Sequence, residues 1–167
     1  SAARDRILYY FRKYPHVIIS GDELLVVSGI QEYARRVREL RVQLGWAIAS
    51  GVTIKEMCAV DPDEVSNELK VMLPSQYILL RAEKDRDAAH RWHVAHSIRK
   101  ERTSVRDKIL AFMRANIGQS VTNEELRYVA GDKTEWARRV RELRTEFGWP
   151  IITKTTGQPD LDIGVYV

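Results

Sequence analysis

The segment YARRVRELR, at residues 33–41, recurs as WARRVRELR at residues 136–144. The two copies differ only at their first residue, where Trp136 replaces Tyr33. A Gly-Trp pair follows each copy, Gly45-Trp46 in the first and Gly148-Trp149 in the second. A match of this length within one chain indicates a duplicated structural unit, so the fold is to be sought around each copy.

Length and composition limit the classes of protein. The chain has 167 residues and a net charge of +4, enough for two small units with a modest basic excess. Its single cysteine, Cys58, excludes an internal disulfide and a zinc-thiolate cluster, and favours a reducing, cytoplasmic compartment. No apolar run approaches the roughly 20 residues of a membrane helix. The apolar alternation at the C-terminus and the missing initiator methionine suggest an excised piece of a longer protein.

Helical signals occur in the same order in both halves. A first helix is predicted at residues 4–14 and again at 105–115. The spacings Ser20 to Glu23 and Thr122 to Glu125 are typical of capping boxes and predict a second, short helix. The Arg-rich third helix follows a tight turn and ends at the Gly-Trp pair. Asp132 to Glu135 has a further capping spacing, before the second Arg-rich helix.

Strand signals follow each third helix. Residues 151–153 and 163–167 alternate with period two around Gly157 and predict a hairpin. In the first half, residues 47–49 and 77–80 are the corresponding strands, separated by a predicted helical insertion at about 51–73 that Pro62 breaks. Three helices with a tight turn and a hairpin predict a winged helix-turn-helix.

The predicted fold class is therefore mainly α with small β-hairpins (α+β), in two winged helix-turn-helix domains joined by a connecting helix. We predict domain 1 at residues 1–81 with its insertion, the linker helix at 82–104, and domain 2 at 105–167. The linker carries a narrow apolar stripe, Ala88, Trp92, Ala95 and Ile98. The role of the insertion is not evident from the sequence, although an interface is preferred over a solvated decoration.

The outward face of each third helix carries the candidate DNA-binding residues. Arginine binds guanine bidentately or holds phosphate as a persistent charge. We predict base reading by Arg35, Arg38, Glu39, Val42, Arg138, Arg141, Glu142 and Thr145. We predict phosphate binding by Arg36, Arg41, Arg139, Arg144 and Lys133, and by Lys154, Thr155, Thr156 and Gln158 at the hairpin tip. Glu39 and Glu142 have an alternative role, which is to hold neighbouring arginines in place.

Each of these roles has an alternative in which the residues serve only the structure. Arg and Glu spaced three and four apart also stabilise a solvated helix, and a polar hairpin tip needs no ligand. Trp46, Trp149 and Phe147 are expected to pack in the cores. His90, His93 and His96 lie three apart, so adjacent pairs could share a metal but all three fit one poorly, and no metal site is predicted. No catalytic constellation is recognisable, so this chain is predicted not to be an enzyme by itself.

The run from residue 105 to 167 resembles the winged-helix region that precedes the nuclease domain in bacterial HNH endonucleases. The resemblance is carried by Asp107–Leu110, Glu125–Gly131, Trp136–Leu143 and Gly148–Ile151, and the first copy resembles the same module. It implies the DNA-targeting part of a restriction endonuclease whose cutting domain and divalent metal lie elsewhere. It also suggests that a methylated base is read.

The predicted function is binding of double-stranded DNA, which the resemblance extends to methylated DNA, with no cofactor in this chain. A transcription regulator with the same modules and a winged-helix protein-interaction module are the alternatives. The target sequence and the presence of a homodimer are left open.

Overall fold

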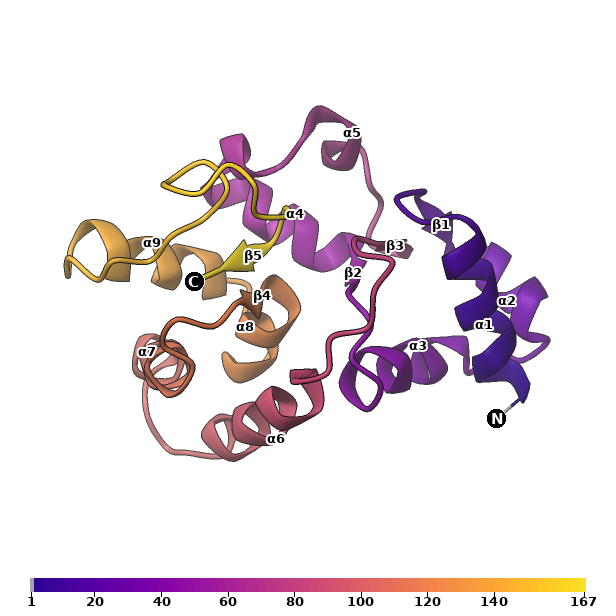
Figure 1. The fold of residues 1–167 in the computed structure, drawn as a ribbon, viewed down its shortest axis with the longest axis horizontal. Coiled ribbons are helices and arrows are strands. Elements are labelled where there is room, and N and C mark those ends of the chain that lie inside the picture. Colours follow the sequence, from indigo (N-terminus) through magenta and orange to yellow (C-terminus); the bar gives the residue numbers. More distant parts are fainter. Residues whose placement is uncertain (1) are drawn as a thin grey trace. The chain divides into compact units, whose positions relative to one another are not determined.

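The computed structural model describes residues 2–167 and is mainly helical, with small antiparallel sheets (Figure 1). It forms two compact units. Unit 1 comprises residues up to 52 together with 72–90, and unit 2 comprises residues 53–71 together with 91–167. No helix among the described residues is long and apolar enough to span a membrane.

Unit 1 contains three helices and a three-stranded sheet. Its elements are α1 (Ala2–Lys13), β1 (Ile19–Ser20), α2 (Gly21–Ser28), α3 (Tyr33–Val42), β2 (Ile48–Ser50) and β3 (Gln76–Leu79). The strand order is β1-β3-β2, and both pairings are antiparallel. Ile48 lies opposite Leu79 in the β2–β3 register, so the strands predicted on either side of the insertion do pair.

The unit 1 core forms where the helices present apolar residues one turn apart. Ile7 and Phe11 of α1 are fully buried and cluster with Val37 and Leu40 of α3. The predicted capping box is present: Glu23 N donates to Ser20 Oγ at 3.1 Å, and Ser20 N donates to the Glu23 carboxylate at 3.1 Å. These contacts fix the start of α2 and hence the turn into α3.

Unit 2 repeats this order and adds other segments. Its repeated elements are α7 (Val105–Ala115), β4 (Val121–Thr122), α8 (Asn123–Val129), α9 (Trp136–Thr145) and β5 (Val165–Tyr166). β4 and β5 pair antiparallel. Trp136 is fully buried, as are Ile109 and Phe112 of α7. The capping box from Thr122 to Glu125 begins α8 as predicted.

The predicted insertion packs within unit 2. It consists of α4 (Gly51–Val60), the 3-10 turn η1 (Pro62–Glu64) and α5 (Asn67–Lys70). Residues 53–71 belong to unit 2, although the strands on either side of them pair in unit 1. Contacts between residues distant in sequence therefore define the compact units, and their limits differ from the domain limits predicted from chain order.

The predicted linker helix, α6 (Ala88–Arg99), is anchored to unit 2 from residue 91 onwards. Its apolar stripe is buried. Arg91 Nε donates to both carboxylate oxygens of Glu125, at 3.0 and 3.2 Å, and the two side chains are 5% and 1% exposed. The pKa of Glu125 is raised, because the effect of burial is larger than the opposing effect of the Arg91 charge. The ion pair therefore compensates a carboxylate that also caps α8.

The predicted hairpin in unit 2 is much reduced. Ile152 and Val167 exchange two backbone hydrogen bonds, at 2.8 and 3.0 Å, but residues 151–153 form no regular strand. Thr153 N donates instead to Thr156 Oγ1 at 3.0 Å, and residues around Gly157 form turns. The ladder ends here because a local side chain takes the backbone donor that a longer hairpin would need.

Three further local expectations were wrong. Phe147 is 51% exposed instead of packing in the core, and the Arg106 guanidinium lies 4.6 Å from its ring. Trp149 is 37% exposed, whereas its counterpart Trp46 is only 8% exposed. Asp132 adopts a left-handed φ of 59° and receives arginine hydrogen bonds, while Glu135 is the N-cap residue of α9.

Replacing Arg91 with Met should lower the unfolding free energy of unit 2 by about 3–5 kcal/mol, because it leaves a buried carboxylate without its counter-charge. Urea denaturation measures the loss. The double variant R91M/E125Q should recover part of it, and R102M, at an exposed cation, is the matched control. A loss in R91M no greater than in R102M would contradict the stabilising role of the pair.

Candidate nucleic-acid interface

The exposed side of α3 carries the predicted base-reading arginines of unit 1. Arg35 and Arg38 are exposed, and the Arg35 side chain is 70% accessible. Val42 and Arg41, at the end of the helix, are partly buried. Two long cations therefore project from one helical face at the spacing that the sequence predicted.

Glu39 lies at the centre of a cluster of guanidinium groups in unit 1. It accepts a hydrogen bond from Arg36 at 3.2 Å, and Arg4 and Arg35 lie 3.7 and 4.0 Å away. Its side chain is 16% exposed. This geometry matches the role of Glu39 in orienting arginines, the alternative to accepting from a cytosine.

The same arrangement recurs on α9. Arg139 Nη1 donates to both Glu142 oxygens, at 2.7 and 2.8 Å, and its Nη2 donates to Glu135 at 3.1 Å. Hydrogen bonding to Glu142, with Glu135 contributing, raises the pKa of Arg139. Arg138 is exposed and makes no hydrogen bond or ion pair with any residue between 2 and 167. Arg138 is therefore the α9 arginine most available to a ligand.

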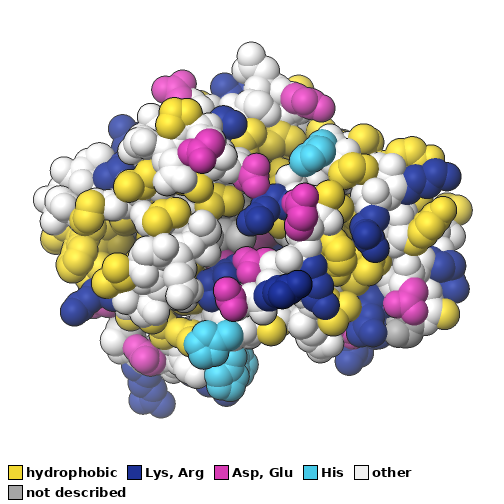
Figure 2. Space-filling model, viewed as in Figure 1, with side chains coloured by type: hydrophobic (Ala, Val, Ile, Leu, Met, Phe, Trp, Pro, Cys, Tyr) yellow, Lys and Arg dark blue, Asp and Glu magenta, His cyan; other side chains and the backbone are white. Residues whose placement is uncertain are grey.

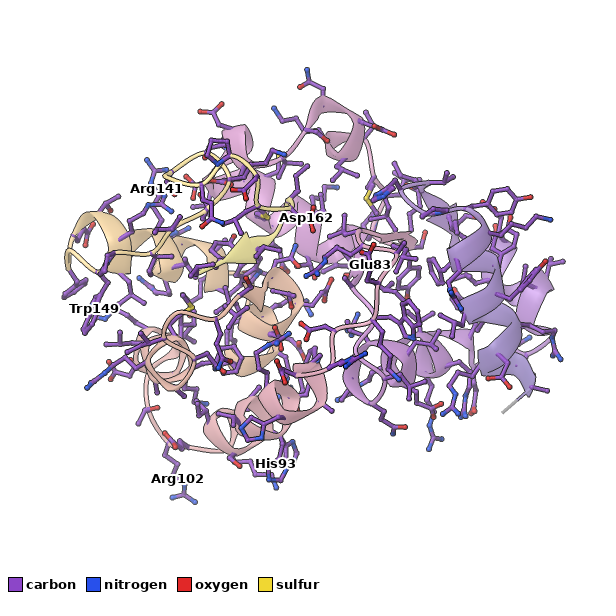
Figure 3. All side chains as sticks on the ribbon, viewed as in Figure 1. Glu83, His93, Arg102, Arg141, Trp149 and Asp162 are labelled. Atoms are coloured by element: carbon purple, nitrogen blue, oxygen red, sulfur yellow. The ribbon has the colours of Figure 1, made fainter. Side chains whose placement is uncertain are left out.

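Arg141 and Arg144 of α9 contact the inserted segment. Arg141 Nη1 donates to the Val60 carbonyl at 3.0 Å and lies 3.7 Å from Asp61, while Arg144 Nη2 lies 3.6 Å from Asp61. Arg141 projects from α9, with its side chain 52% exposed (Figure 3). Thr145 donates its hydroxyl hydrogen to the Arg141 carbonyl at 2.9 Å. Residues predicted to contact DNA are thus already engaged by an acidic segment of the same unit.

Glu56 anchors that segment. It accepts from the indole Nε1 of buried Trp136 at 2.9 Å and from Arg127 Nε at 2.8 Å. Arg127 also donates to Asp132 at 3.0 Å. Because a buried indole N–H needs an acceptor, Glu56 fixes α4 against α8 and α9.

The loop of residues 153–163, which includes the predicted hairpin tip, also contacts the insertion. Glu64 is buried and accepts from the hydroxyls of Thr153 and Thr155. Burial raises the pKa of Tyr166, and the negative charges of Glu64 and Asp61 add to the shift. The other predicted phosphate ligands at the surface are Lys133, Lys154 and Thr156, which are exposed, and Gln158, which is half-buried.

A polar hollow lies between α4 and α9. Its volume is about 460 Å³, and it is lined by Glu56, Ala59, Val60, Thr134, Glu135, Arg138 and Arg141. Two carboxylates and two guanidinium groups share this lining, so the local charge is mixed. Charges of both signs also lie next to one another elsewhere on the surface (Figure 2).

Sequence patterns did not identify Glu56, Asp61 or Glu64. Their acidity was the available signal, since four carboxylates occur between residues 56 and 64. Nothing local indicated that their partners would lie 71 to 91 residues further along the chain.

The three histidines of α6 lie at the surface. Figure 3 shows His93 on the outer side of the helix. His96 Nδ1 lies 2.8 Å from the Tyr128 hydroxyl. No group of three or more His, Cys, Asp or Glu within residues 2–167 has a metal-binding arrangement.

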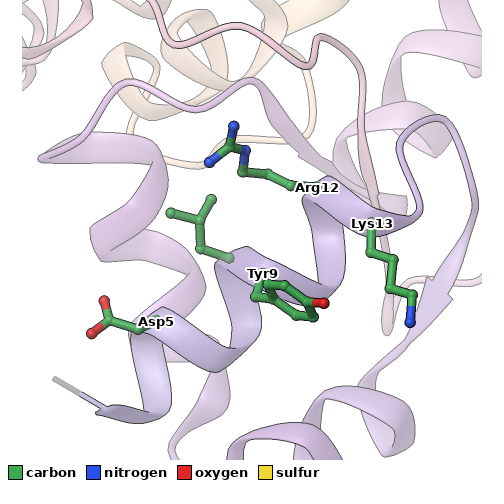
Figure 4. A pocket seen from close by; sticks show the side chains of 5 residues that line it. Asp5, Tyr9, Arg12 and Lys13 are labelled. Atoms are coloured by element: carbon green, nitrogen blue, oxygen red, sulfur yellow. The ribbon is translucent and has the colours of Figure 1, made fainter.

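A separate shallow hollow, of about 460 Å³, lies on α1 in unit 1 (Figure 4). It is lined by Asp5, Leu8, Tyr9, Arg12 and Lys13. Its two cations contact aromatic rings, with Arg12 5.3 Å from Trp46 and Lys13 5.7 Å from Tyr14. We do not include it in the candidate interface, because a single helix supplies its whole lining.

Replacing Glu56 with Ala should destabilise unit 2 by about 2–4 kcal/mol, because the Trp136 indole N–H and Arg127 both lose their acceptor. Hydrogen exchange of that indole proton should become faster, which reports the contact directly. E68A, at an exposed acidic residue of the same insertion, is the control. Unchanged indole exchange in E56A would show that the insertion is held by other contacts.

Most of the chain matches a family of known proteins. A family model described as the KpnI N-terminal domain matches residues 4–80 and 106–167, and each range contains one copy of the repeat. KpnI is a restriction enzyme. No curated protein and no solved structure matches the chain significantly.

Proposed function

Because the chain belongs to the family of KpnI N-terminal domains, we propose that it binds double-stranded DNA through tandem winged-helix modules, with α3 and α9 as the two recognition helices. The match relates the chain to DNA recognition by a restriction enzyme. The observation that carries the proposal is the duplicated row of outward arginines on the third helix of each copy, since this helix enters the major groove in helix-turn-helix proteins.

The two units support this reading through their order of elements. In unit 1 the sequence α1, β1, α2, α3, β2, β3 with strand order β1-β3-β2 is compatible with a winged helix. We assign Arg35, Arg38 and Arg138 to base edges, because they are exposed on the outer faces of α3 and α9. The flanking cations and Lys154 are assigned to phosphates, because phosphate contacts position a protein on the duplex without reading its sequence.

For the longer protein, we propose a restriction endonuclease of the HNH type, with the cutting domain and its metal outside this chain. The alternative functions, a transcription regulator and a protein-interaction module, use the same fold. An interaction module is disfavoured because its binding would not require the repeated arginines.

The chain should bind duplex DNA with strong salt dependence. If about 6–8 Lys and Arg side chains contact phosphate, log affinity against log salt should have a slope of about −5 to −7. Replacing Arg35 or Arg38 with Ala should cost about 1–3 kcal/mol each, measured by fluorescence anisotropy. R102A, at an exposed arginine outside α3 and α9, is the control.

Arg35→Lys and Arg38→Lys separate base reading from charge. Lysine keeps the charge but loses the bidentate fork, so these variants should keep the salt slope and lose sequence preference among duplexes from a selection experiment. Duplex binding unaffected by any of these substitutions would favour the interaction-module alternative.

Methyl reading is tested with duplexes of one sequence, prepared with and without N6-methyladenine. Tighter binding to the methylated duplex, beyond about twofold, would support a modification-dependent enzyme. Equal binding to both would remove methyl recognition from the proposal and leave an ordinary sequence reader.

A further inference from the structure

The inserted segment places acidic side chains on the surface that we assign to DNA in unit 2. Residues 56–64 carry four carboxylates, Glu56, Asp61, Asp63 and Glu64. Asp61 contacts Arg141 and Arg144 of α9. Glu64 contacts Thr153 and Thr155, in the loop that follows α9. Carboxylate oxygens here take the partners that phosphate oxygens or base acceptors would take in a complex.

These carboxylates differ in how firmly they are held. Glu56 is tied to a buried indole, and Glu64 is itself buried. Asp61 is half-buried, and its ion pairs to Arg141 and Arg144 are long, at 3.7 and 3.6 Å. The Arg141 side chain is 52% exposed, whereas that of Arg144 is 17% exposed. Long pairs that solvent reaches contribute little to stability, so a phosphate next to Arg141 can replace Asp61. Asp61 is therefore the exchangeable member of the segment.

A backbone carbonyl of the insertion also holds the Arg141 side chain. The Val60 carbonyl accepts a hydrogen bond from Arg141 Nη1 at 3.0 Å, next to the Asp61 carboxylate. The guanidinium is thereby drawn towards the end of α4 and η1. Contact with a base edge requires Arg141 to exchange a carbonyl and a carboxylate for DNA acceptors.

We propose that Asp61 competes with DNA for Arg141 and Arg144, and thereby weakens duplex binding by α9. The inference rests on the proposed function and identifies a residue that controls the interface. The insertion from the first copy of the repeat thus sets the affinity of the second. Discrimination increases as well, because a contact on α9 must be stronger than the Asp61 pairs in order to form.

The test compares D61N with D63N on a 20-base-pair duplex of random sequence. Both substitutions remove one negative charge, but Asp63 is exposed and contacts neither arginine in the described structure. D61N should tighten binding about three- to tenfold, and the salt slope should steepen by about 1–2 as two cations become available. D63N should change the affinity less than twofold.

The same substitution in a chain that lacks Arg141 and Arg144 tests whether the tighter binding depends on these two arginines. In an R141A/R144A background, D61N should no longer tighten binding, because the groups that it releases are absent. The Asp61 side chain makes no capping hydrogen bond to η1, so D61N is expected to fold, and thermal unfolding verifies this.

The outcomes separate the two proposals. Equal effects of D61N and D63N, weaker binding by D61N, or tightening that persists in R141A/R144A would each overturn the competition while leaving DNA binding intact. Absence of duplex binding by both the wild-type chain and D61N would overturn the proposed function and this inference with it. Binding by D61N alone would support both.

Discussion

A single carboxylate, Glu56, determines how the inserted segment relates to the second copy of the repeat. Trp136 is fully buried, so its indole N–H must find an acceptor inside the protein, and Glu56 supplies it. Arg127 neutralises the same carboxylate at 2.8 Å. Because these contacts fix α4, they also restrict where the chain that follows α4 can lie. Asp61 then lies beside α9, and Glu64 lies beside the threonines of the neighbouring loop.

The position that differs between the two copies of the nine-residue motif is thus the one that matters for packing. Tyr33 in α3 is half-buried, whereas Trp136 in α9 is fully buried and donates to the insertion. The rest of the motif behaves alike in both copies, since Arg36 pairs with Glu39 and Arg139 pairs with Glu142. The exchange of one aromatic residue is accompanied by a new partner segment on one copy. Duplicated sequence therefore does not imply duplicated surface chemistry.

Local signals predicted the fold well, because each of them acts within a few residues. Both capping boxes formed as expected, and Gly45 and Gly148 adopt left-handed φ values of 75° and 71° after their helices. Helical spacing also identified the apolar stripe of α6, and these residues are buried. The first copy's strands were placed correctly despite the long insertion between them.

Contacts between distant residues could not be predicted in this way. Asp61 and Arg144 are far apart in sequence, and their approach depends on the anchoring of α4 by Glu56. The same limitation explains Trp149, for which equivalence to Trp46 predicted burial that the surroundings in unit 2 do not provide. A repeat predicts the internal packing of each copy, but its outer surface is completed by segments that the repeat does not include.

Two such segments, the insertion and the helix α6, both pack in unit 2. The buried Arg91–Glu125 pair fixes α6 there, and Glu125 is also the residue that caps α8. One carboxylate therefore connects the start of a helix of the repeated module to the connecting helix, so movement of either disturbs a buried charge. Unit 1 is close to the bare module, whereas unit 2 is the module with two additions. Changes in the insertion can therefore alter the surface of unit 2 without any change in the nine-residue motif itself.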